Sequence, residues 1–227
     1  MDRKAVFSLG KKSLIETLKL QAPMEMEYSV SYETEKDKRK FIERTKRSIR
    51  KSMEYKDYIR FLKDNMDMDR CSFFKNVQHT KDNKVKIEVH HEPFTLDDIV
   101  RIVINKQMDE GKPLNELDIA DEVMELHYSD EIGLIPLSIT VHEVIHSQES
   151  KITIPLTLCY GDYRKFVEDY QDYIEDDILT RLEYKIENTK NITQESFNAL
   201  LTKYLYLDVD GVNAPSKIEV EVGDLVA

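Results

Sequence analysis

Two histidines spaced one helical turn apart constrain this chain more than any other feature of its sequence. They are His142 and His146, in the stretch GLIPLSITVHEVIH at residues 133–146, where Ser138 can cap a short helix that begins at Ile139. The spacing of four places both imidazoles on one face of that helix. Because two neutral imidazoles on one face form half of a site for a divalent transition metal, the stretch predicts a metal centre.

A second histidine pair lies far from the first in the sequence. His90 and His91 end the alternating run KVKIEVHH, which predicts a strand, and four of the six histidines of the chain fall in the two pairs. Adjacent side chains on a strand point to opposite faces, so in regular geometry only one of the two shares the metal. The other is expected to face elsewhere, for instance toward a substrate.

One interpretation of the predicted helix is a zinc peptidase. Residues 142–146 spell H-E-x-x-H, in which Glu143 is the general base beside a zinc ion. Glu168, twenty-two residues past the second histidine of the motif, is spaced like the third ligand of gluzincin-type proteases. Against this interpretation, Pro136 and Ser138 start the helix just before the motif, whereas zincins have a long helix there.

A second interpretation comes from a resemblance to the HNH, or His-Me finger, nucleases. The stretch resembles the second half of an HNH finger, in which the leucine, cysteine and histidine places are taken by Leu134, Leu137, Ser138, Val141, His142 and His146. The first half of the finger is matched by Cys71-Ser72-Phe73-Phe74, which keeps one cysteine of a Cys-x-x-Cys knuckle, and by His90-His91 followed by Pro93. Gly133 stands where the family has an asparagine. The missing cysteines imply a finger whose structural zinc is replaced by ordinary packing.

The resemblance implies a metal-dependent endonuclease. One divalent ion (Mg²⁺, Mn²⁺, Ni²⁺ or Zn²⁺) would be held by His90, His142 and His146, and His91 would activate water for attack on a DNA phosphodiester. The same resemblance allows a catalytically inactive HNH-fold protein that binds nucleic acid or a phage or host protein during assembly. The lysine-, isoleucine- and tyrosine-rich sequence, with helices added to the finger, is typical of a bacteriophage protein, for which the host cytoplasm is the expected location.

Charge is strongly segregated along the chain. The 227 residues carry a net charge of -11, yet residues 36–63 hold twelve Lys or Arg and four Asp or Glu, a local balance of +8 that leaves -19 for the remainder. Segregation of this kind favours a basic surface for an anionic partner. We expect residues 34–66 to form one long helix or two, whose cationic face binds DNA phosphates through Lys46, Arg47, Arg50 and Lys51. The plainer alternative is a solvated helix that packs its apolar seam on the core.

The predicted fold class is α+β: a ββα-metal, HNH-like finger with helical insertions and flanking helices. We expect an N-terminal segment (1–33), the basic helical arm (34–66), the finger domain with its insertion (67–160) and a helical C-terminal extension with a terminal strand (161–227).

Local patterns predict the elements within these parts. A β-hairpin is expected between strands at 71–77 and 85–89, and helices are expected after Thr95 and after Leu114. Further on, we expect a short apolar strand within 151–161, one long helix over 162–188 and another over 194–205. No apolar run is long enough to span a membrane, no signal peptide is recognisable, and two cysteines fit a reducing compartment.

Overall fold

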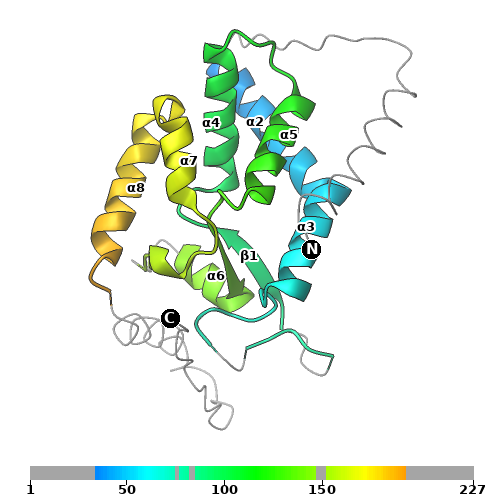
Figure 1. Cartoon of the computed structure of the whole chain (residues 1–227), viewed down its shortest axis with the longest axis vertical. Coiled ribbons are helices and arrows are strands. Elements are labelled where there is room, and N and C mark those ends of the chain that lie inside the picture. The colour runs from blue at the N-terminus through cyan, green and yellow to red at the C-terminus, as the bar shows by residue number, and fades with distance from the viewer. Residues whose placement is uncertain (1–33, 75–76, 82–84, 147–151, 193–227) are drawn as a thin grey trace.

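A two-stranded antiparallel sheet lies at the centre of the fold. The computed structural model describes residues 34–74, 77–81, 85–146 and 152–192 (Figure 1). Strand β1 (Ile87–His91) pairs with β2 (Leu134–Ser138) in a register that sets Ile87 opposite Ser138 and His91 opposite Leu134. Helix α6 (Ile139–His146) follows β2 directly and packs against both strands. The α+β class is therefore confirmed.

Side-chain chemistry at the helix starts explains where the helices of the first half begin. The side chains of Thr34, Ser52, Thr95 and Asn115 each accept a hydrogen bond from a backbone N–H in the first turn of the helix that follows. The helices that they cap are α2 (Glu35–Lys51), α3 (Met53–Asn65), α4 (Leu96–Asp109) and α5 (Glu116–Tyr128). The basic arm is thus two helices, which break at Ser52.

These helices and the sheet enclose two hydrophobic clusters. The larger cluster lies between α2, α3, α4, α5, α7 and α8 and includes Ile99, Ile102 and Phe166, none of which is exposed to solvent. The smaller one lies on the other side of the sheet, where Ile135 and Leu137 of β2 pack with Cys71 and other apolar side chains. Successive strand residues therefore face different surroundings: the helical layer on one side, and α6 with the residues before β1 on the other.

The expected hairpin at 71–89 is wrong in its first strand. Among the described residues of the earlier segment, Arg70 and Gln78 form an isolated bridge with each other, and the partner of β1 is β2, which follows the α4–α5 insertion. The reason is burial: Leu134, Ile135 and Leu137 are fully buried, so β2 brings far more apolar surface to β1 than the segment before it offers. Residues 70–74 remain attached through the Ser72 N–H, which donates to Pro136 O over 2.9 Å.

The single helix expected over 162–188 is also wrong. The chain forms α7 (Tyr163–Tyr170), a 3-10 turn η2 (Gln171–Tyr173) and α8 (Asp176–Thr189), with an extended backbone at Ile174 and Glu175 between them. Polar side chains of α4 hold this break: Asn105 donates to Tyr173 O over 3.0 Å, and Arg101 forms an ion pair with Glu175.

Of the remaining expected elements, one is wrong and the others lie outside the described residues. The apolar strand expected within 151–161 is wrong for the described part, where a 3-10 turn η1 (Leu156–Leu158) and an isolated bridge between Leu134 and Tyr160 occur instead. The segment 1–33, the helix at 194–205 and the terminal strand lie outside the described residues. Among the helices that the structure does describe, none is both long and apolar enough to cross a membrane.

Candidate metal centre

Three histidines from β1 and α6 converge at one end of the sheet. His90, His142 and His146 each offer a ring nitrogen, and these nitrogens all lie within 4.8 Å of one another. The ring centroids of His90 lie 5.0 Å from those of both other histidines, and His142 and His146 are 4.5 Å apart. In the parts of the chain that the structure describes, this is the one such group of three potential ligands. It matches the ligand set predicted from the sequence.

One pair of ring nitrogens in this cluster has a separation that fits a shared cation. His142 Nε2 lies 3.1 Å from His90 Nδ1. A tetrahedral ion with metal–nitrogen bonds of about 2.0–2.1 Å holds two ligand nitrogens about 3.3 Å apart, close to this separation. An imidazole donor set suits Zn²⁺, Ni²⁺, Cu²⁺ and iron better than Mg²⁺. The residues present therefore fit a transition-metal ion.

Two carboxylates face the nitrogens that point away from this pair. Glu88 Oε2 lies 3.3 Å from His142 Nδ1, and Glu92 Oε2 lies 3.4 Å from His90 Nε2. Each carboxylate favours a proton on the nitrogen beside it, which leaves the lone pairs of His142 Nε2 and His90 Nδ1 facing each other. Two facing lone pairs repel unless a cation lies between them. A carboxylate behind each metal-binding histidine is also the usual arrangement in metalloproteins.

The two helical histidines are held in the neutral form that a metal requires. Burial lowers the pKa of His142 and of His146 below the ordinary value, and the neighbouring His90 lowers both further. Because a protonated imidazole cannot bind a metal, this cluster keeps ligands available down to a lower pH than exposed histidines would.

His91 lies on the opposite face of β1, as the strand geometry predicts, and it is buried there. Its side chain packs in the helical layer with 7% of the residue exposed, stacked on Tyr55, and its Nε2 lies 3.0 Å from Nε2 of His127. Burial, with the neighbouring His127, lowers the pKa of His91 well below its ordinary value. We expected this side chain to face a substrate, for instance, and in the structure it is buried instead. His127 was missed, because nothing around it in α5 distinguishes it from scaffold.

The structure does not bring the third ligand of the peptidase interpretation, Glu168, into the histidine cluster. Glu143 is exposed on α6, between the two helical histidines, and Glu168 is exposed on α7. Within the described part of the chain, the third member of the cluster is His90, and Glu168 does not belong to it.

The predicted cationic face on α2 is present in part. Arg47, Arg50 and Lys51 are exposed. Lys46 is different: its ammonium lies 2.6 Å from Asp97 and 2.7 Å from Glu43, and its side chain is 16% exposed. Lys46 therefore fixes α2 to the start of α4, and the other three side chains remain available to an anionic partner.

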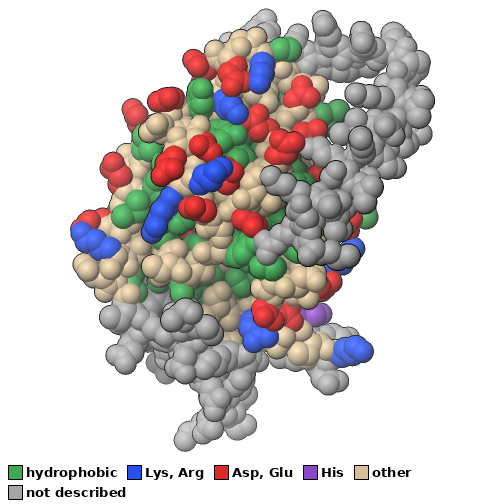
Figure 2. All heavy atoms as spheres, in the orientation of Figure 1, with side chains coloured by type: hydrophobic (Ala, Val, Ile, Leu, Met, Phe, Trp, Pro, Cys, Tyr) green, Lys and Arg blue, Asp and Glu red, His purple; other side chains and the backbone are tan. Residues whose placement is uncertain are grey.

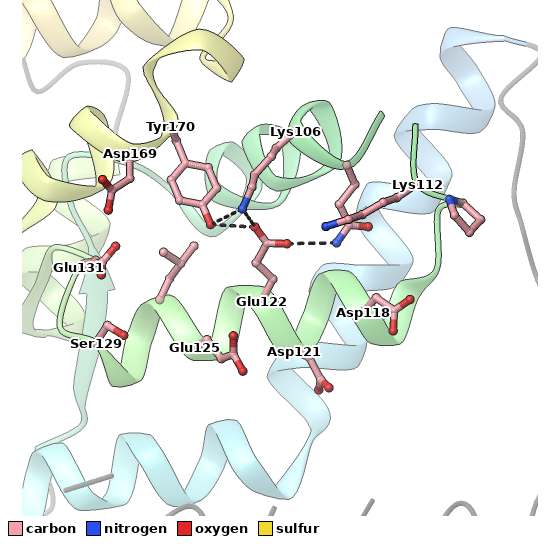
Figure 3. A pocket seen from close by; sticks show the side chains of 13 residues that line it. Lys106, Lys112, Asp118, Asp121, Glu122, Glu125, Ser129, Glu131, Asp169 and Tyr170 are labelled. Carbon is pink, nitrogen blue, oxygen red and sulfur yellow. Dashed lines mark hydrogen bonds and ion pairs between the residues drawn. The ribbon is translucent and has the colours of Figure 1, made fainter. Parts of the chain in front are cut away.

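On the face of the molecule shown in Figure 2, acidic side chains are numerous and basic ones lie among them. A cleft of about 750 Å³ lies between α4, α5 and α7 (Figure 3). At its centre, Glu122 accepts hydrogen bonds from Lys106 and Tyr170, both over 2.7 Å, and from Gln107 over 3.1 Å. Burial works to raise the pKa of Glu122, but these hydrogen bonds outweigh it and lower the pKa. The central carboxylate is therefore used to hold three helices together.

Comparison with known proteins identifies the family. Neither a search of curated proteins nor a search of solved structures finds a match. The family model described as bacteriophage G278-like virion protein matches residues 10–213, which is most of the chain. The histidine cluster, both strands and all the helices described above fall inside that match. The chain belongs to the bacteriophage G278-like virion protein family.

Proposed function

We propose that this virion protein is an HNH-like finger protein that binds one divalent metal ion for structure and assembly and does not cleave DNA. The burial of His91 is the observation that carries this choice. Nuclease chemistry needs a base within hydrogen-bonding reach of the attacking water. His91 is the base that the HNH resemblance implies, and it lies in the helical layer, on the other face of β1 from the three candidate ligands.

The order of elements supports the finger resemblance. Strands β1 and β2 are antiparallel and α6 follows them, with one candidate ligand on β1 and two on α6. The places of the lost zinc knuckle also support it. Cys71, Phe74 and Val141 are buried in one hydrophobic cluster, and Ser138 Oγ accepts a hydrogen bond from the Val141 N–H at the start of α6. Packing can thus replace a structural zinc there.

The metal would add a cross-link between α6 and β1. Of the eight residues of α6, Val141 is the one that is fully buried. An ion held by His90, His142 and His146 would fasten this helix to β1, because its ligands come from both elements. Such a module suits a particle component that must keep its shape after assembly.

Adding a metal is expected to stabilise the protein, and His142→Ala should remove the effect. An ion that binds the folded state alone contributes about 3 kcal/mol at a free concentration one hundred times its dissociation constant. For a chain of this size, that raises the melting temperature by about 5–10 °C. We would measure the melting temperature with Zn²⁺, Co²⁺ or Ni²⁺ added and again after chelation.

His79 provides the matched control. It is exposed, lies outside the cluster and hydrogen bonds to Val85 O through Nδ1. His79→Ala should therefore keep the full metal-dependent rise. A wild-type protein whose melting temperature is unaffected by every metal would contradict the proposal.

Metal-dependent DNA cleavage is the second candidate function. The observation that favours it is the partial exposure of the cluster: the His142 side chain is 28% exposed and His146 lies at the surface. A metal bound by three protein ligands can keep a position open for substrate, and exposed Arg47, Arg50 and Lys51 could contact phosphates. Plasmid nicking by the wild type with Mg²⁺, Mn²⁺, Ni²⁺ or Zn²⁺, lost in His142→Ala, would establish this candidate and overturn the structural role.

A further inference from the structure

A buried carboxylate connects the histidine cluster to the last helix described. The side chain of Glu92 is 5% exposed and follows β1 directly. One of its oxygens, Oε2, faces His90 Nε2 at 3.4 Å. The other, Oε1, lies 2.7 Å from Nζ of Lys185 on α8. Glu92 thus has a candidate metal ligand on one side and a cation from a distant part of the chain on the other.

The ion pair with Lys185 fixes the position of this buried carboxylate. A buried carboxylate without a partner would be costly, so the pair is important for the packing around it. Glu92 Oε1 receives no well-aligned hydrogen bond, so the ion pair with Lys185 is its main compensation. The ammonium is itself held in place, because it also donates to Pro93 O over 2.7 Å. Removing Lys185 would therefore leave Glu92 without this partner, so that its side chain could move away from His90.

The position of the Glu92 side chain matters for the orientation of His90. A carboxylate oxygen beside Nε2 favours the tautomer whose proton is on that nitrogen, and it leaves Nδ1 free to bind a metal. A displaced side chain would lose that preference. The position of Glu92 is fixed by its backbone too, since its N–H donates to Gly133 O over 2.9 Å, just beyond the last strand pair.

We propose that Glu92 is a positioning residue for the metal ligand His90, and that Lys185 on α8 holds Glu92 in that position through their ion pair. The inference rests on the proposed metal site. Helix α8 runs toward the end of the molecule where α6 lies (Figure 1). Because binding linkage is reciprocal, a bound metal also tightens the docking of α8. Helix α8 is thereby connected to the state of the metal centre.

Arg181 offers a matched control on the same helix. It lies one turn before Lys185 and also pairs with a buried acid: Arg181 Nη2 lies 2.6 Å from Oδ1 of Asp98, at the start of α4. Neither residue belongs to the histidine cluster. Arg181→Met therefore removes one ion pair of α8 and leaves the path from Lys185 through Glu92 to His90 in place.

The test is a Co²⁺ titration of the full chain, followed by visible absorption and by competition with Zn²⁺. We expect Glu92→Gln and Lys185→Met each to weaken Co²⁺ binding by about tenfold or more, and to alter the absorption bands of the bound ion. The double variant should bind about as well as the weaker single variant, because Lys185 acts through Glu92. Arg181→Met should bind like the wild type. Hydrogen exchange of α8 should slow on Co²⁺ addition in the wild type and not in Glu92→Gln.

The possible failures are distinguishable. Wild-type affinity in both Glu92→Gln and Lys185→Met, or an equal loss in Arg181→Met, would overturn the inference while leaving the metal site intact. A wild-type protein that binds no Co²⁺ would overturn the proposed function and this inference with it. If Glu92→Gln does not fold, as judged by circular dichroism, Lys185→Met carries the test, because its partly exposed side chain can be replaced with less disturbance.

Discussion

Replacing Gly133 by alanine is expected to lower the free energy of unfolding by about 4 kcal/mol or more. A Cβ atom at this position would lie 1.9 Å from the backbone oxygen of Glu92 and 3.2 Å from Cδ of Pro93. The first contact is with backbone, which no rotamer change can relieve. To make room, β2 would have to move away from the end of β1. Urea unfolding of the variant and the wild type measures the loss.

Gly111→Ala is the control for this prediction. Gly111 has a φ of +67°, which alanine tolerates poorly, but a Cβ there would meet nothing within 4 Å. Its cost is the backbone strain alone, about 1–2 kcal/mol. Equal losses in the two variants would show that close approach at Gly133 does not matter. The same contact explains the glycine at this position, since no side chain fits against the Glu92 carbonyl.

Local chemistry predicted the helices of the first half well. Thr34 and Thr95 cap helices as expected, and Ser138 caps α6, because these hydroxyls satisfy N–H groups in the next turn wherever the rest of the chain goes. The helix face formed by His142 and His146 follows from spacing alone in the same way. Such features depend on residues within one turn of each other, so the sequence is sufficient to predict them.

Pairing between distant segments could not be predicted in this way. The apolar stretch that forms β2 has no alternation, so it was not distinguishable from the approach to a helix, and β1 was assigned the nearer partner. The break after α7 also depends on residues that are distant in the sequence. Nothing in residues 171–175 stops a helix, and the break is held by Asn105 and Arg101 of α4, which are far away in the sequence.

The sequence predicted which three histidines come together, but it did not predict what surrounds them. His90 was chosen over His91 by the HNH resemblance, and strand alternation required that the two face opposite sides. Which side is buried depends on the packing of α3 and α5 against β1, and this became visible in the structure. The orienting carboxylates were likewise hidden, because Glu92 acquires its role from Lys185, 93 residues later in the chain.

The buried histidine pair gives the second large prediction, a loss of stability in mild acid. His127 Nδ1 lies 2.7 Å from Val123 O, so it must carry a proton and donate. His127 Nε2 is then the acceptor for Nε2–H of His91, 3.0 Å away. Protonating His127 would set two N–H groups against each other. Burial lowers the pKa of His127 from 6.5 to about 4, while the backbone hydrogen bond to Val123 acts in the opposite direction.

The direction of the effect follows from where protons bind. Below pH 6.5 the unfolded chain takes up a proton on each histidine, and the folded protein does not until the pH approaches the lowered value. Stability is therefore complete above pH 6.5 and falls as the pH drops from 6.5 toward 4. At pH 5 the loss is about 2 kcal/mol for His127, and the lowered pKa of His91 acts in the same direction.

We would measure this by urea unfolding at pH 7.5 and pH 5, with chelator present so that metal binding makes no contribution. His127→Gln lowers stability at both values, but the difference between them should shrink by about 2 kcal/mol, because glutamine does not titrate. His79→Gln, which changes an exposed histidine, should leave the difference unchanged. If His127→Gln retains the full wild-type difference, the acid sensitivity arises elsewhere. If the difference shrinks as expected, the buried position of His91, and with it the case against a catalytic base at that residue, gains direct support in solution.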